Sequence, residues 1–306
     1  MARSLLPRKP SKTLAAVKTT AEDLRKGIPM AFSVNTNAGA MVALQNLNST
    51  QSSLMTTENR INTGLKVASA KDNAAIWAIA QNQRATSSSL NSVISSLQRG
   101  QSTVDVALSA GNSVADLLNQ MKEKALAAAD ATLDTNSRAA LNDEFKSLRD
   151  QINKVVNNAE FSGANMIKSG GTTIKALANA DASSVITVAA QDLSLGGTVL
   201  TSSLGTGATI NTVTTATNMI STINTDITSV ASALGKLGTG SKALSSHLTF
   251  IQSLQNTIDT GIGNLVDADL AKESANLQAL QTKQQLGIQA LSIANQSSSI
   301  LLGLFR

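Results

Sequence analysis

Residues 284–305 read QQLGIQALSIANQSSSILLGLF, a run without a single charged side chain. Leu291, Ala294 and Leu301 recur at spacings of three and seven residues, as on a helix with one apolar stripe. The run is long enough to cross a bilayer, but its Gln, Asn and Ser side chains would cost free energy in lipid. We therefore expect a helix that other protein covers on all sides.

Residues 27–57, near the other end of the chain, are also uncharged. The helical pattern there has a seam whose members are three and four residues apart in turn: Leu44, Leu47, Gln51, Leu54, Glu58, Ile61 and Leu65. Such a seam fits pairing with the C-terminal helix inside one bundle. Because outer charges are missing from both helices, we expect further pairing with neighbouring copies, that is, polymerisation.

The composition favours narrow helix-on-helix packing. Only 2 % of the 306 residues are aromatic, with no Tyr and a single Trp, Trp77, whereas a thick globular core buries many rings. We interpret Trp77 as a packing residue. The chain has no Cys, which excludes disulfides, thiol chemistry and Cys-based metal sites.

Residues 1–29 differ from the rest of the chain. They hold all three prolines of the chain. Seven basic side chains against two acidic ones give this extension a net charge of +5, which equals the formal net charge of the whole chain. The remaining chain is therefore neutral and offers no cationic face to nucleic acid. No apolar run of secretory type is present. The extension is interpreted as a disordered tail or as sequence upstream of a true start at Met30, and the start at Met30 is favoured.

Between the two ends the pattern remains helical. Helices are predicted at about 72–131 with Ser69 or Asp72 as the cap, at 138–159, and from 220 to 265 with a break at Gly235, Gly238 and Gly240. Segment 168–217 is rich in Gly, Thr and Ser; strands are indicated at 183–190 and, less firmly, at 196–203 and 208–214.

The predicted fold is mainly α, a long antiparallel helical bundle or coiled coil built from both chain ends, with a small β-rich or irregular central insertion. Terminal helices span 30–65 and 270–306, and a helical shell domain spans 66–167 and 218–269. The insertion, 168–217, is expected at the surface, at the end of the bundle opposite the termini. Shell packing is assigned to the following residues: Leu141, Phe145, Leu148, Ile152, Val155, Ile251 and Ile258.

No residue pattern indicates catalysis, a cofactor or a metal. His247 is the single histidine and lies next to apolar seam positions, which indicates packing rather than a general base. Asp267 and Asp269 are two apart and do not share a helix face. With Glu273 they fit an acidic cluster at a helix N-terminus better than a metal site.

Four motifs carry a resemblance to a known family: SAKDNAA at 69–75, EFSG at 160–163, LVDADLAKES at 265–274 and the C-terminal block at 284–306. Occurring in this order, they resemble bacterial flagellin, most closely the alphaproteobacterial type. The resemblance covers nearly all of residues 30–306; a basic leader like 1–29 is not usual in the family. Gln120 and Lys124 stand where flagellins sensed by the vertebrate innate immune receptor carry Arg and Leu, so the resemblance does not imply that recognition.

The resemblance implies a structural subunit that polymerises, with itself and with other flagellins, into the extracellular flagellar filament. It implies export through the flagellar type III pathway, an export chaperone on the C-terminal helix, and contacts with hook-associated and cap proteins. No nucleic acid or membrane insertion is expected. Filament-core packing is assigned to the following residues: Leu44, Leu47, Leu54, Ile61, Leu277, Leu280, Leu291, Ala294, Leu301 and Phe305.

Two other functions are kept as alternatives. A hook–filament junction protein of the same superfamily would resemble the chain at both ends but would match the C-terminal block less fully. A secreted adhesin would present the Thr- and Ser-rich insertion on a helical stalk, without forming filaments.

Overall fold

The structure, a computed structural model, describes residues 37–200, 204–205 and 207–304, with only the backbone for 297–304. The extension at 1–29 and the start at Met30 lie outside the described residues. The chain divides into two compact units. The first, here called the terminal unit, joins both chain ends, Met1–Ala68 and Ala268–Arg306, and the second, here called the middle unit, is Ser69–Asp267. The mainly helical fold with a small central sheet is confirmed.

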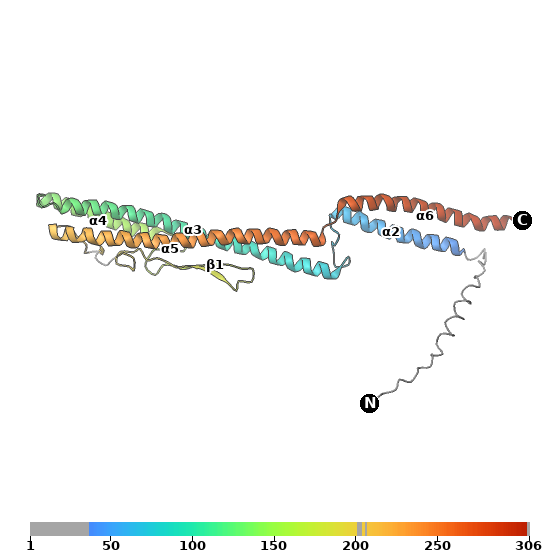
Figure 1. The fold of residues 1–306 in the computed structure, drawn as a ribbon, viewed down its shortest axis with the longest axis horizontal. Helices are drawn as coiled ribbons and strands as arrows, with labels where there is room; N and C mark the ends of the chain where they lie inside the picture. Colours follow the sequence, from blue (N-terminus) through green and yellow to red (C-terminus); the bar gives the residue numbers. More distant parts are fainter. Residues whose placement is uncertain (1–36, 201–203, 206, 305–306) are drawn as a thin grey trace, which may run out of the picture. The chain divides into compact units, whose positions relative to one another are not determined.

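The terminal unit is an antiparallel pair of helices, α2 (Ala38–Thr63) and α6 (Leu270–Leu304), which lie side by side in Figure 1. Helix α2 is capped at its C-terminal end by Gly64, whose φ of 69° is the left-handed conformation that a glycine cap adopts without strain. Asp269 begins α6, since its carboxylate accepts hydrogen bonds from the backbone N–H groups of Ala271 and Lys272. The backbone N–H of Ala268 donates to the carbonyl of Gly64 and ties the two helix ends together.

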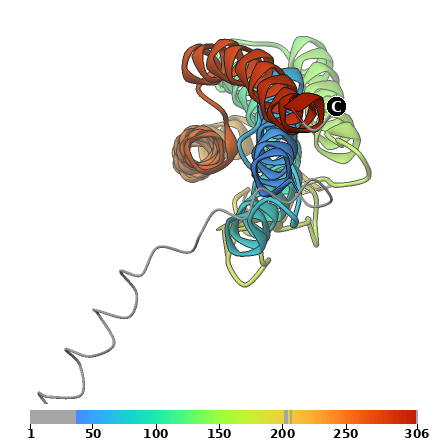
Figure 2. The same cartoon turned by 90° about the vertical axis from the view of Figure 1, so that its right-hand side faces the viewer.

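The middle unit is built on three helices, α3 (Ala74–Ala128), α4 (Thr135–Asn158) and α5 (Val213–Val266). Helix α3 packs against both of the others. Figure 2 draws the same ribbon as Figure 1 after a turn of 90° about the vertical axis. The predicted cap of α3 is wrong. Asn73 is the cap, and its side chain accepts from the N–H of Ile76. Asp72 instead closes a turn by accepting from the N–H and the hydroxyl of Ser69.

The predicted break in α5 is also wrong, because the helix runs without interruption from Val213 to Val266. An isolated glycine inside a helix costs only about 1 kcal/mol relative to alanine, which a long packed helix tolerates. Gly240 has a packing role. A Cβ there would lie 2.5 Å from a methyl group of Val188, so the glycine lets the neighbouring strand approach α5.

The segment between α4 and α5 contains an antiparallel two-stranded sheet, β1 (Ile174–Leu177) and β2 (Val185–Val188), with Ile174 opposite Val188. The strand predicted at 183–190 is confirmed by β2. The less firm prediction at 208–214 is wrong, since α5 begins at Val213, and the described residues at 196–200 form turns and bends. Strand β1 was not predicted, because its four residues include the polar Lys175 and the small Ala176 and give no clear alternation.

This segment lies along the helices rather than beyond their end, which corrects the expected position. It supplies buried apolar side chains to the same core as α3, α4 and α5: Met166, Ile167, Ala176, Val188, Leu193, Leu200, Leu204 and Ile210. Polar anchors support it. The N–H of Leu177 donates to the hydroxyl of Ser96 on α3, and the N–H of Ile210 donates to the buried side chain of Asn142 on α4.

Candidate assembly surface

The contact between α2 and α6 is formed by small and medium apolar side chains. Leu54 is buried, and the following residues are half-buried: Leu47, Ile61, Leu277, Leu280, Leu291 and Ala294. Gly287 lets the helices approach closely, because a Cβ there would lie 3.2 Å from a methyl group of Leu47. Leu44 is 47 % exposed and lies off this contact. The side chain of Leu301 and all of Phe305 lie outside the described residues.

Polar bonds fix the register of the two helices. The amide of Gln284 donates to the amide oxygen of Gln51 at 2.6 Å, on the seam position where the sequence shows a polar residue. Closer to the C-terminal end of α2 and the N-terminal end of α6, Arg60 forms a salt bridge with Glu273 at 3.2 Å. Glu273 is 8 % exposed, so its carboxylate is largely withdrawn from water, whereas the side chain of Arg60 remains 35 % exposed. Polar pairs of this kind select one alignment among the many that an apolar seam would accept.

Several large apolar side chains of the terminal unit lie exposed outside the α2–α6 contact. Eight of the thirteen large apolar side chains that are exposed in the described residues belong to these two helices: Met41, Val42, Leu44, Met55, Leu270, Leu286, Ile288 and Ile293. Their exposed fractions run from 47 % at Leu44 to 67 % at Ile293. Apart from Leu44, the seam did not identify them, because they lie to either side of it. The signal that indicates them is the absence of outer charge.

Apart from Leu270, which lies beside Asp269 and Lys272, this exposed surface has no charges to keep it in water. No charged residue lies between 38 and 57 on α2 or between 284 and 304 on α6. A monomeric protein rarely leaves a contiguous apolar patch of this kind open, and such patches mark interaction sites. The surface of the terminal unit is therefore suited to being covered by other protein.

The side chains assigned to shell packing meet within the middle unit. Phe145 and Ile152 are fully buried, and Ile251 is 1 % exposed. The other assigned residues are partly buried against the same core: Leu141, Leu148, Val155 and Ile258. Asp143, Asp150 and Lys154 of α4 are exposed, whereas Arg149 of the same helix is 8 % exposed. Lys124 of α3 binds Glu144 of α4 at 2.6 Å.

The residues considered for chemistry have structural roles. The Nε2 atom of His247 is 2.7 Å from the carbonyl oxygen of Ala178, and its ring lies 5.7 Å from that of Phe250, so it ties α5 to the β1–β2 turn. Asp269 caps α6 and Glu273 pairs with Arg60. Among the described residues, no three His, Asp or Glu side chains gather as metal ligands would.

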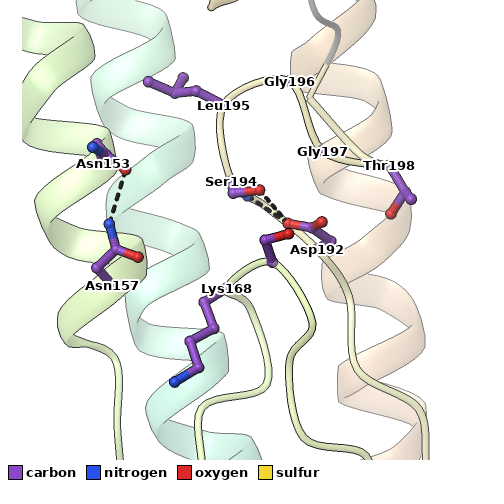
Figure 3. A pocket seen from close by; sticks show the side chains of 10 residues that line it. Asn153, Asn157, Lys168, Asp192, Ser194, Leu195, Gly196, Gly197 and Thr198 are labelled. Atoms are coloured by element: carbon purple, nitrogen blue, oxygen red, sulfur yellow. Dashed lines mark hydrogen bonds between the residues drawn. The ribbon is translucent and has the colours of Figure 1, made fainter.

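A polar hollow of about 580 Å³ lies between α4 and the loops near Lys168 and Gly196 (Figure 3). Its carboxylate, Asp192, accepts from the N–H and the hydroxyl of Ser194 and so stabilises a turn. Lys168 extends away from that carboxylate in Figure 3. The residues that line the hollow include no histidine, and the Asp192 carboxylate that contacts the Ser194 hydroxyl also accepts from the backbone N–H of Ser194 and so serves the turn.

No helix in the described part of the chain combines the length and the apolar character that a membrane span needs.

Comparison with known proteins decides the family. The family model of the bacterial flagellin N-terminal helical region matches residues 34–173, and that of the C-terminal helical region matches residues 210–305. The chain belongs to the bacterial flagellin family. It is 58 % identical to flagellin FljK of Caulobacter vibrioides over 274 residues, covering 90 % of this chain and 98 % of that one. It is 38 % identical to a flagellin of Brucella melitensis, covering 90 % of this chain and 99 % of that one.

Flagellins are structural proteins, and this chain is accordingly a subunit of the extracellular bacterial flagellar filament. Among solved structures, a putative flagellar hook-associated protein from Vibrio parahaemolyticus matches with a TM-score of 0.52 and 16 % identity, covering 64 % of this chain and all of that one. At that identity the match shows a shared fold and no more.

Proposed function

We propose that the α2–α6 pair is the part of the subunit that forms the filament core, and that neighbouring copies cover its exposed apolar side chains. The observation that carries the proposal is the concentration of exposed, uncharged apolar surface on these two helices. Burial stabilises by about 25 cal/mol per Å² of apolar surface, so covering several large side chains on each copy favours association. The intramolecular contact uses one face of each helix and leaves the others for copies.

The middle unit then forms the outer helical shell. Its helices carry charges on their outer faces, and its core closes within one subunit. Segment 168–217 belongs to this shell as a thin layer along the helices, and its exposed side faces solvent in the filament. The side chains assigned to the filament core, Leu301 and Phe305 included, remain part of this proposal.

Electron microscopy of the purified chain, seeded with filament fragments, tests the function. We expect long filaments, because each copy added covers apolar surface on the last. The same preparation separates this function from the adhesin alternative. If the chain stays a monomer or a small oligomer at concentrations at which other flagellins form filaments that sediment, the filament function is contradicted.

The chemistry of α6 also supports an export chaperone as a partner. Before assembly, Leu286, Ile288 and Ile293 lie exposed on the uncharged part of α6, residues 284–304. Such a surface needs to be covered in the cell. We expect the chaperone to bind this helix ahead of export by the flagellar type III pathway, and hook-associated and cap proteins to contact the same unit at the filament ends. Deletion of residues 270–306 should abolish chaperone capture in a pull-down. Retained capture would show that the chaperone binds elsewhere.

A further inference from the structure

The methionines of the two units differ sharply in how much of each side chain is exposed. On α2, Met41 is 64 % exposed and Met55 is 55 % exposed. In the middle unit, Met121 and Met166 are fully buried and Met219 is 8 % exposed. Within the described residues, the two exposed thioethers therefore belong to the proposed assembly helix, and the middle unit shields the others.

Met41 and Met55 share one side of α2. They are fourteen residues apart on the same helix, close to four turns of about 3.6 residues each. Leu44, one turn from Met41, is also exposed. These three side chains are here called the methionine stripe. They lie beside the face that contacts α6, with the exposed Asn48 between Leu44 and Met55.

We propose that Met41 and Met55 are oxidation sites through which peroxide controls assembly of the free subunit. This rests on the proposed function, since it requires neighbouring copies to cover the methionine stripe. The thioether sulfur attacks one oxygen of hydrogen peroxide, the O–O bond breaks, and an S–O bond forms. The sulfur is oxidised to the sulfoxide, while the peroxide is reduced and leaves as water after a proton shift. The reaction is reversible by methionine sulfoxide reductases.

The sulfoxide changes the stripe in the direction that opposes assembly. It replaces a soft apolar thioether by a strong hydrogen-bond acceptor. Water satisfies that acceptor in the free subunit, but a neighbouring apolar helix would not. Burying a polar group without a partner is costly. The inference also predicts protection, because a copy already inside the filament has its stripe covered.

The test treats the purified full chain with hydrogen peroxide and follows each methionine by peptide mass spectrometry. Met41 and Met55 should oxidise well before Met121, Met166 and Met219. Growth from untreated filament seeds should then slow by about tenfold or more, since an unpartnered polar group is buried with each added copy. In preformed filaments the two sites should stay reduced. Equal oxidation of buried and exposed methionines, or oxidation of the stripe within filaments, would overturn the proposal.

The matched control is the double variant Met41→Leu with Met55→Leu, which conserves apolar volume. It retains every other methionine, and its growth should be the same before and after peroxide. Reductase treatment of oxidised wild type should restore growth, which supplies a second readout that needs no variant. If growth survives oxidation of the stripe, or reductases do not restore it, the inference fails. If untreated protein forms no filaments, the proposed function fails instead.

Discussion

At the scale of the residue, Gly111 of α3 shows how tightly the middle unit is packed. A Cβ there would overlap the side chain of Leu234 on α5 and lie 3.5 Å from Leu193. Gly111→Ala must displace the Leu234 side chain, at the usual overpacking cost of about 1–3 kcal/mol, while helix propensity returns about 1 kcal/mol. The free energy of unfolding of the Ser69–Asp267 unit should therefore fall by up to about 2 kcal/mol. Urea unfolding followed by circular dichroism measures it.

Gly235 of α5 is the matched control. It is also inside a long helix, but a Cβ there would meet nothing within 4 Å. Gly235→Ala should raise the free energy of unfolding by up to about 1 kcal/mol through helix propensity alone. Equal effects of the two substitutions would show that the α3–α5 contact is looser than described. The sequence predicted a helix break at Gly235 and nothing unusual at Gly111, so the packing difference between the two glycines required the structure.

At the scale of the element, the start of α4 couples stability to pH. The carboxylate of Asp134 accepts from the N–H groups of Asn136 and Ser137. Hydrogen bonds from Ser137 first, and then from Asn136, hold the pKa of Asp134 below its usual value. Because the folded pKa is the lower one, this capping contribution is fully present above the unfolded pKa and is lost as pH falls through the folded pKa.

Asp134→Asn isolates that contribution. Asparagine caps a helix about as well as aspartate but does not titrate in this range. The variant should match wild type near pH 7 and lose less thermal stability on acidification to about pH 3, below the usual carboxyl pKa. Thermal unfolding followed by circular dichroism at both pH values measures the difference. Parallel losses in the two proteins would mean that other carboxylates account for the acid sensitivity.

The elements also show how far the sequence alone reaches. Seams of Leu, Ile and Val located all the described helices, since a period of three and four residues survives in any packing arrangement. Gly64 caps α2 for a purely local reason, because glycine adopts the left-handed conformation without strain. Strand β1 and the unbroken course of α5 were not predicted from the sequence, because each depends on contact with a distant segment. The close approach of Val188 to Gly240 is one such contact.

At the scale of the whole molecule, the assembly surface was predictable in kind but not in detail. Two uncharged helices near opposite ends of the chain indicated polymerisation. The seam identified Leu54, which is buried against the partner helix within one subunit. It did not identify Met55 or Ile293, because side chains awaiting another copy need not follow the seam of the first contact. Their exposure appears only once α2 and α6 are placed together.

The central claim is that the α2–α6 pair is the assembly core, and Leu291→Asp tests it most directly. Leu291 is half-buried on α6, and a carboxylate there would have no partner once copies cover the helix. Lys154→Asp, on an exposed face of α4, is the control for an added carboxylate on a helix that meets water. Both variants should keep the circular dichroism of a folded middle unit. Sedimentation and electron microscopy after seeding should then show filaments for Lys154→Asp and none for Leu291→Asp, whereas normal filaments from Leu291→Asp would contradict the account.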